Sequence, residues 1–219
     1  MVMDKEIVRK IIHVLAAVAA APFLLFFDLT TGILVALAGL GIIWTIWYLE
    51  ERGRKLKGPA RKGQEMLAKT MENAMRPEER FPWASFYFVA GLIAVASASQ
   101  LLEVPLSVAF AAYAVLGVGD AGSALIGKAY GAMPIPWNPK KSWEGTGAGI
   151  GAAYPWAVLL ATAFYAYFNQ PFPSHLYWII MVGTLVGMLA ETLPGEDNLT
   201  IPVASWATMA ALGALIGLF

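Results

Sequence analysis

A series of long apolar runs dominates the 219-residue chain and restricts what it can fold into. The runs cover roughly 11–27, 30–49, 83–101, 105–126, 146–168, 175–193 and 199–219. A bilayer core about 30 Å thick needs about 20 apolar residues per helix. Because lipid offers the backbone no hydrogen-bond partners, such runs must be helical. We therefore predict an all-α polytopic membrane protein with about seven transmembrane helices, forming one domain over residues 1–219.

The composition excludes most other classes of protein. Hydrophobic residues make up 58% of the chain and charged residues 14%, whereas a soluble domain is about 45–50% apolar and about 25% charged. Fifteen basic and fifteen acidic side chains give a formal net charge of zero, so no nucleic-acid partner is expected. The absence of cysteine excludes disulfides and thiolate metal sites. Cysteine nucleophiles are excluded as well, and the two histidines, His13 and His175, are too few for a His-rich metal site.

The basic residues fall on one side of the predicted bundle. All fifteen lie at the N-terminal end, in the connection at about 50–82, or in the connection after the fourth run. With seven spans these places face one compartment, which the positive-inside rule identifies as the cytoplasm. We therefore predict a cytoplasmic N-terminus. The charged loop at 50–82 carries apolar residues at helical spacing, which predicts a helix at the headgroups, a helical extension of the second span, or a lid over a site.

Three ionisable residues mark the start of the first run. On a helix, Arg9 and Lys10 lie on the same face as His13, which follows them by four and three residues. Two cations and an imidazole at the cytoplasmic edge form a candidate anion site. The alternative for the two cations is snorkelling to lipid phosphates.

The fourth run contains an acid inside an apolar helix. Asp120 follows Gly119, and Gly127 and Gly131 continue a stripe of small residues along the same face. A carboxylate inside a membrane costs about 2.5–3.5 kcal/mol, so Asp120 needs a cation or metal as partner. Residues 122–128 also match the first part of a P-loop and end at Lys128, but Ala129 stands where a P-loop needs Ser or Thr, and no strand precedes it.

Two connections add a basic and an acidic cluster. After three prolines come Lys140, Lys141 and a candidate N-cap, Ser142, followed by Glu144 and Gly145 at the start of the fifth run. Lysines beside the free N–H groups of a helix start suit a phosphate. Before the seventh run, the acidic cluster consists of Glu191, Asp197 and the neutral Asn198. Its oxygens suit a hard cation, although Asp and Asn also form ordinary turns.

All of these clusters lie on the predicted cytoplasmic face. Cations for phosphate together with carboxylates for Mg²⁺ are the inventory of phosphoryl or nucleotidyl transfer. Because the site lies at the bilayer surface, the second substrate is expected to be a lipid.

The sequence resembles the CTP-dependent lipid-alcohol kinases, the family of dolichol, polyprenol and phytol kinases and the yeast-type CTP-dependent diacylglycerol kinase. The resemblance rests on Arg9-Lys10-x-x-His13, Gly119-Asp120 with Gly127 and Gly131, Lys141-Ser142-x-Glu144-Gly145, and Glu191 with Asp197-Asn198-x-x-Ile201-Pro202. These motifs span nearly the whole chain. The departures are Lys128, where many relatives have Arg, and a chain shorter than the eukaryotic dolichol kinases.

The resemblance implies transfer of the γ-phosphate of CTP to the hydroxyl of a membrane isoprenoid alcohol, at a site facing the cytoplasm. The alcohol is dolichol or polyprenol, or a shorter prenol such as geranylgeraniol or phytol; diacylglycerol is a further option. Mg²⁺ is expected on Asp120, Glu191 and Asp197. The residues expected to act in catalysis are Asp120, Lys141, Glu144 and His13. Those expected to bind the nucleotide are Arg9, Lys10, Gly119, Gly127, Lys128, Gly131, Lys140, Ser142, Gly145 and Asn198.

The residues leave several alternatives open. Asp120 could be a metal ligand or the base that takes the hydroxyl proton. A cytidylyltransferase making a CDP-lipid uses a similar inventory, and a transporter also carries ionisable residues in its spans. The expected partners are the nucleotide, the lipid alcohol and membrane lipids, and formation of a homo-oligomer is left open.

Overall fold

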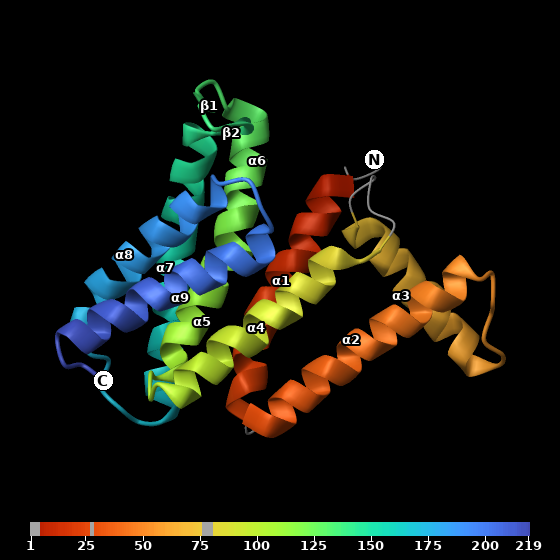
Figure 1. The fold of residues 1–219 in the computed structure, drawn as a ribbon, viewed down its shortest axis with the longest axis horizontal. Coiled ribbons are helices and arrows are strands. Elements are labelled where there is room, and N and C mark those ends of the chain that lie inside the picture. Colours follow the sequence, from red (N-terminus) through yellow and green to blue (C-terminus); the bar gives the residue numbers. More distant parts are fainter. Residues whose placement is uncertain (1–4, 27–28, 76–80) are drawn as a thin grey trace.

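The computed structural model describes residues 5–26, 29–75 and 81–219, and most of them lie in helices (Figure 1). The first helices are α1 Lys5–Phe26, α2 Leu29–Glu51, α3 Pro59–Ala74 and α4 Trp83–Leu101. They are followed by α5 Leu106–Ala114, the π-helix η1 Val115–Gly119, α6 Asp120–Tyr130, α7 Trp143–Tyr167, α8 His175–Glu191 and α9 Asp197–Leu215. An antiparallel hairpin, β1 Pro134–Ile135 and β2 Asn138–Ser142, precedes α7. The predicted all-α membrane class is confirmed, with this hairpin as a local addition.

Among the described residues, five helical stretches are long and apolar enough to cross a bilayer. They are Thr30–Glu51, Trp83–Leu101, Leu106–Tyr130, Trp143–Tyr167 and Asp197–Leu215, and α8 is a shorter apolar helix. Each coincides with a predicted run, and α4 has the predicted bounds. Helix α1 corresponds to the first run, whose last residue, Phe27, lies outside the described residues. The total of seven spans and the side of the N-terminus stay predictions.

The core of the bundle is the continuous segment α5–η1–α6. Helix α5 is apolar on all sides, which is typical of a helix buried within a bundle. It packs against α1, α4, α7 and α9. Tyr113 is fully enclosed there, and its hydroxyl donates a hydrogen bond to the Phe88 carbonyl on α4 at 2.8 Å. The centre of the molecule therefore fixes the direction in which α6 leaves it.

Small residues let α6 and α7 approach closely. A Cβ atom at Gly145 would stand 2.7 Å from the Ser123 carbonyl oxygen and 3.0 Å from the Gly127 Cα atom. In membranes, such backbone-to-backbone contacts replace the hydrophobic drive to helix association. The glycine stripe predicted on the fourth run is thus used for helix packing along much of its length.

The charged loop folds into a helix of its own. The chain turns after α2 through Gly53 and Gly58, both at positive φ, so α3 is no extension of the second span. The buried Gln64 amide accepts from the Leu56 N–H and donates to Glu50 and to the Arg54 carbonyl. Helix α3 packs against α1 and α2, and its role as a lid stays a prediction.

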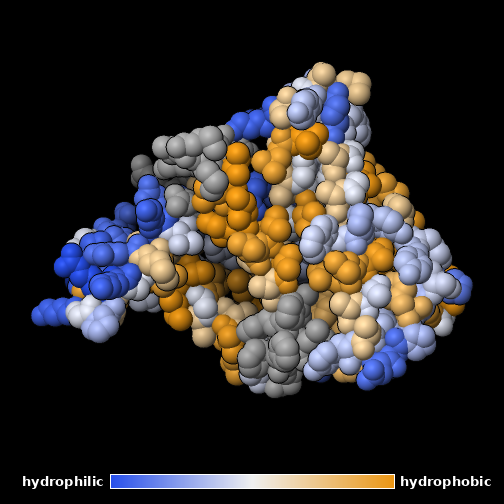
Figure 2. Space-filling model, turned by 180° about the vertical axis from the view of Figure 1, so that it is seen from behind, coloured by the Kyte–Doolittle hydropathy of each residue, from blue (hydrophilic) through white to orange (hydrophobic). Residues whose placement is uncertain are grey.

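The outer surface reflects a membrane environment. Large apolar side chains are exposed along most of the helices. Figure 2 shows apolar residues over much of the body, whereas hydrophilic residues gather at the end formed by α3 and the turn that leads into it. A soluble monomer rarely exposes apolar patches of this extent, so this surface is suited to lipid.

Candidate functional site

A cavity of about 1050 Å³ lies where α6, the hairpin, the α8–α9 connection and the N-terminal part of α1 meet. The residues that line it include Arg9, Lys10, Asp120, Ser123, Gly127, Lys128, Gly131, Trp137, Asn138, Lys140, Lys141, Ser142, Gly145, Glu191 and Asp197. Most of the residues predicted to form the site therefore share one cavity. His13, Gly119, Glu144 and Asn198 do not line it.

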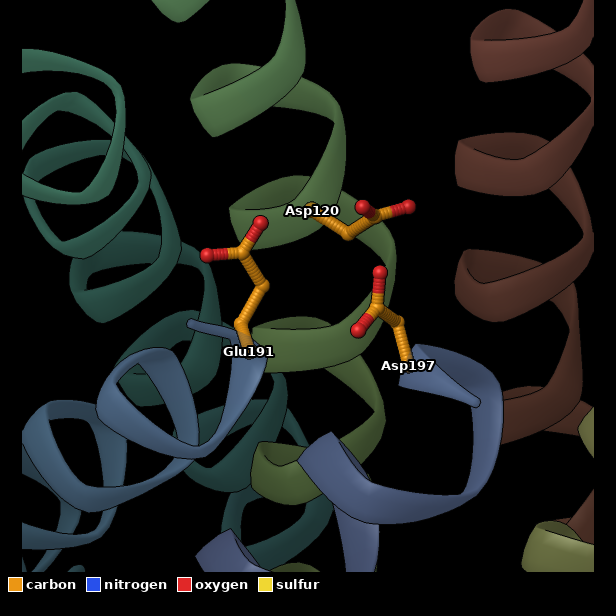
Figure 3. A group of neighbouring side chains, drawn as sticks. All are labelled: Asp120, Glu191 and Asp197. Atoms are coloured by element: carbon orange, nitrogen blue, oxygen red, sulfur yellow. The ribbon is translucent and has the colours of Figure 1, made fainter. Parts of the chain in front are cut away.

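Three carboxylates form the acidic part of the cavity. Asp120 is the first residue of α6, Glu191 the last of α8 and Asp197 the first of α9. One carboxylate oxygen from each lies within 4.8 Å of the others, and Figure 3 shows the side chains converging from their three helices. All three acids lie at helix ends. The π-helix η1 ends and α6 begins at Asp120, and Pro194 and Gly195 separate α8 from α9.

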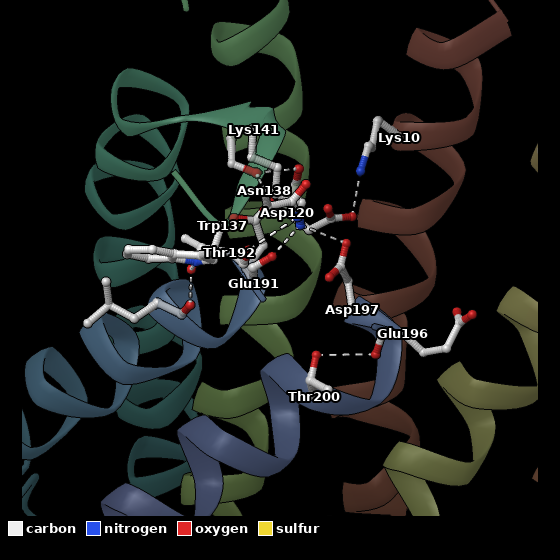
Figure 4. A network of polar contacts seen from close by, with 12 residues as sticks. Lys10, Asp120, Trp137, Asn138, Lys141, Glu191, Thr192, Glu196, Asp197 and Thr200 are labelled. Atoms are coloured by element: carbon white, nitrogen blue, oxygen red, sulfur yellow. Dashed lines mark hydrogen bonds and ion pairs between the residues drawn. The ribbon is translucent and has the colours of Figure 1, made fainter. Parts of the chain in front are cut away.

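Two lysines from other parts of the chain neutralise most of this charge. The Lys10 ammonium on α1 lies 2.6 Å from Asp120 Oδ2. The Lys141 ammonium on β2 lies 2.8 Å from Glu191 Oε1 and 3.0 Å from Asp197 Oδ2, and it also donates to the Glu191 carbonyl oxygen (Figure 4). Buried carboxylates are tolerated only with such partners. The five side chains thus form one mutually dependent cluster, which we call the charge cluster.

The carboxylates hold the Lys141 ammonium in its charged form. Burial of Lys141 acts to lower its pKa, but the nearby Asp197 and Glu191 outweigh burial and raise the pKa above its ordinary value of 10.5. Lys141 therefore acts as a fixed positive charge and not as a proton donor near neutral pH.

The three acids of the charge cluster could hold a metal ion. Among the described residues, Glu191 Oε2 is buried without a hydrogen-bond partner, while Glu191 Oε1 accepts from Ser123 and pairs with Lys141. Three carboxylates against two ammonium groups leave a negative excess. Oxygen ligands about 4.2 Å apart, across an ion with bonds of about 2.1 Å, suit Mg²⁺. For the three acids to hold such an ion, Lys10 and Lys141 have to release part of their pairing with them.

His13 does not line the cavity, but it lies close to Asp120. Its Nε2 atom is 3.9 Å from Asp120 Oδ2 and has no hydrogen-bond partner among the described residues. Its ring meets the Phe88 ring edge-on, with the centroids 5.6 Å apart. The trio Arg9, Lys10 and His13 therefore does share one face of α1, as predicted, with Arg9 and Lys10 on the cavity itself.

The predicted catalytic acid Glu144 points away from the cavity. Its carboxylate accepts from the Met133 backbone N–H at 3.1 and 3.2 Å and joins the hairpin to α7. The predicted N-cap at Ser142 is confirmed, because its hydroxyl accepts the Gly145 N–H at 3.1 Å. Both contacts fix the position of β2 and so of Lys141. Glu144 is thus a residue that positions the site from outside.

Two residues predicted to bind the nucleotide serve the fold instead. Gly119 packs against Ala153 of α7 and Met188 of α8, where a side chain would collide. Asn198 donates from its amide to the Ala84 carbonyl at 2.9 Å and joins the start of α9 to α4. Tertiary packing therefore directs Gly119 and Asn198 toward neighbouring helices and away from the cavity.

Sequence reasoning gave no role to three polar residues of the site. The Trp137 indole N–H donates to the Thr192 hydroxyl at 3.0 Å, and the Asn138 amide donates to the Thr192 carbonyl at 3.2 Å. Trp137 lies in the turn of the hairpin and Asn138 begins β2, and Figure 4 shows both near Glu191. The Pro-Trp-Asn-Pro segment was a signal for a turn, but the pairing that carries the turn to Thr192 depends on the fold.

The sequence is similar to known plant lipid kinases. The chain is 24% identical over 226 residues to phytol kinase 1, chloroplastic, of Arabidopsis thaliana, which covers 93% of this chain. It is 27% identical over 217 residues to dolichol kinase EVAN of the same plant, and 23% identical over 213 residues to a probable phytol kinase of Zea mays. The chain is a homologue of these lipid kinases. The family resemblance inferred from the motifs is thereby confirmed.

The matches cover only part of the relatives. The chain spans 66% and 65% of the length of the two phytol kinases and 35% of the dolichol kinase. No protein-family profile matches the chain. No solved structure matches it either.

Proposed function

We propose that this protein is a lipid-alcohol kinase that transfers the γ-phosphate of CTP to the hydroxyl of an isoprenoid alcohol. The observation that carries the proposal is the charge cluster: Asp120, Glu191 and Asp197 with Lys10 and Lys141, brought from five elements into one cavity. Acids that can hold a metal next to lysines that can face phosphate are what phosphoryl transfer requires. The homology to phytol and dolichol kinases supports the same reaction class.

The residues of the cavity divide into two roles. Asp120, Glu191 and Asp197 would hold Mg²⁺, which when bound offsets the charge of the nucleotide phosphates. Lys141 and Lys10 release part of their pairing with the acids and face the phosphate oxygens, with Arg9 and Lys128 on the same cavity wall. Most of the rate enhancement then comes from positioning and electrostatics.

The proposed reaction is a single displacement at the γ-phosphorus. The alcohol oxygen forms a bond to the γ-phosphorus, and the bond from that phosphorus to the β–γ bridging oxygen breaks. CDP leaves with the electron pair, and the hydroxyl proton passes to a base of the cavity. Asp120 is the candidate for this base in the arrangement where Glu191 and Asp197 alone hold the ion, and Lys10, which pairs with Asp120, then has to release it.

An isoprenoid acceptor fits the surroundings of the cavity. The apolar outer surface of the helices can accommodate a prenyl chain in the bilayer, with its hydroxyl at the level of the charge cluster. We place phytol first among the alcohols because the chain spans 66% and 65% of the length of the phytol kinases but 35% of the dolichol kinase. Geranylgeraniol, polyprenol and dolichol follow.

The test is a transfer screen with purified protein in detergent. CTP, ATP, UTP and GTP labelled at the γ-phosphate are each combined with Mg²⁺ and one lipid alcohol. We expect label in the lipid monophosphate and CDP as the second product, fastest with CTP. Pyrophosphate release with α-label in the lipid would indicate a cytidylyltransferase instead. No transfer from any donor to any alcohol would contradict the proposal.

A further inference from the structure

The turn of the β-hairpin forms one wall of the cavity. The proposed phosphoryl transfer assigns no role to this turn. All five residues of β2 line the cavity, from Asn138 at the turn to Ser142 at the start of α7. Trp137 also lines it, immediately before the strand. The end of this wall that carries Lys141 meets the charge cluster, and the other end carries an aromatic ring and an amide.

The Trp137 ring is held as a rigid surface. Its indole N–H is satisfied by the Thr192 hydroxyl at 3.0 Å, and its ring meets Trp143 edge-on at 5.6 Å and 85°. It is nevertheless 51% exposed. A tryptophan that anchors a protein at a membrane interface uses its N–H toward headgroups and water. Here the N–H is already bound within the protein, and the ring is offered to the cavity.

The Asn138 side chain presents an acceptor next to this ring. Only the amide nitrogen can donate to the Thr192 carbonyl, so the bond at 3.2 Å fixes the orientation of the amide. The carbonyl oxygen Oδ1 has no partner among the residues that the structure describes. Asn138 is half-buried and lines the cavity. A ligand that places an amino group here would complete its hydrogen bonds.

The spacing along the hairpin matches an extended ligand. Lys141 follows Asn138 by three residues, which is about 10 Å along a β-strand. That is the scale of the separation between the base and the terminal phosphate of a nucleoside triphosphate. The end of α8 runs beside the strand in the opposite sense, since Thr192 contacts Trp137 and Asn138 and the preceding residue, Glu191, contacts Lys141.

We infer that Trp137 and Asn138 form the subsite for the nucleotide base, with the base stacked on the Trp137 ring and its exocyclic amino group bound to Asn138 Oδ1. This inference rests on the proposed function. It gives a physical reason for preferring CTP over UTP, because uracil carries a carbonyl oxygen where cytosine carries the amino group, and two acceptors repel each other. The stacking contributes affinity for either pyrimidine.

The test measures base preference and not only activity. The ratio of kcat/KM for CTP to that for UTP is determined for the wild type, Asn138→Ala, Trp137→Phe and Trp137→Ala. We expect Asn138→Ala to lower this ratio about fivefold to tenfold, the value of one hydrogen bond. Trp137→Ala should raise KM for both nucleotides about tenfold or more with a smaller change in kcat, and Trp137→Phe should retain most of the affinity. Trp156→Phe, on the outer surface of α7, serves as the matched control and should change neither value.

A direct binding measurement separates this inference from the proposed function. CTP added to the protein should quench tryptophan fluorescence, and Trp137→Phe should lose most of that quenching, whether or not phosphate is transferred. An unchanged ratio in Asn138→Ala, or unchanged quenching in Trp137→Phe, would overturn the subsite. If the wild type transfers phosphate from CTP in those cases, the kinase proposal stands without it. If the wild type transfers none but binds CTP through Trp137, the kinase proposal fails and the subsite stands.

Discussion

At the scale of single residues, the charge cluster is held together by mutual necessity. Asp120 and Glu191 are 6% and 4% exposed, so neither carboxylate can rely on water for solvation. Lys10 and Lys141 supply that solvation from α1 and β2. Removing one member of such a pair leaves a buried charge without a partner, which costs more than the pair contributes. Substitutions here should therefore affect stability as well as chemistry.

The pairing of Lys141 predicts a particular dependence on pH. Its raised pKa means that the charged form is stabilised in the folded protein. That contribution is fully present below its ordinary pKa of 10.5 and is lost as the pH rises through the folded value. Lys141→Met should lower stability by about 1–3 kcal/mol near pH 8. As the pH is raised from 8, the difference in Tm between wild type and variant should begin to shrink only above about pH 10.5. A difference that already disappears between about pH 8 and pH 9 would contradict the assigned pairing.

At the scale of elements, the contact between α6 and α7 positions the site. Ser123, on this contact, donates to Glu191 Oε1, and Gly145 lies in the first turn of α7, the helix that follows Lys141. The two glycines Gly145 and Gly147 differ sharply in their surroundings. A Cβ atom at Gly145 would meet the backbone of α6, whereas one at Gly147 would meet nothing within 4 Å. The pair therefore offers a matched test within one helix.

Gly145→Ala should destabilise the protein by about 1–3 kcal/mol, because the backbone of α6 has to move to admit the methyl group. Gly147→Ala should be neutral or stabilising by up to about 1 kcal/mol, since alanine is the better helix former. Thermal unfolding in detergent measures both effects. Equal losses for the two variants would show that α6 and α7 do not pack through Gly145.

How far the sequence predicted these elements depends on what determines them. Apolar length fixes a membrane helix locally, so the predicted run 83–101 coincides with α4. Residue types that match metal and phosphate chemistry pointed to Asp120, Glu191 and Asp197, which lie together. The π-helix η1, the hairpin pairing and the outward turn of Glu144 depend on contacts between distant segments. No local pattern encodes such contacts, which is why Trp137 and Asn138 were missed.

At the scale of the whole molecule, the one-sided basic residues predict the orientation in the membrane. The chain has no cysteine, so single-cysteine variants report position without background. Lys57→Cys, in the exposed turn between α2 and α3, should react with an impermeant thiol reagent only from the cytoplasmic side. Gln170→Cys, in the exposed connection between α7 and α8, should react only from the opposite side. Labelling of both from the same side would contradict the predicted topology.

The charge cluster is proposed to carry out phosphoryl transfer, and Asp120→Asn removes the charge of one of its three acids. The measurement is the Mg²⁺-dependent transfer of γ-label from CTP to phytol by purified wild type, Asp120→Asn and Glu65→Gln. Glu65 pairs with Arg61 on the exposed face of α3, away from the cavity, and so controls for loss of an ion pair. We predict that Asp120→Asn lowers kcat at least about 100-fold, that Glu65→Gln has no effect, and that a chelator abolishes transfer by the wild type. Transfer by Asp120→Asn at a rate near that of the wild type would contradict the account.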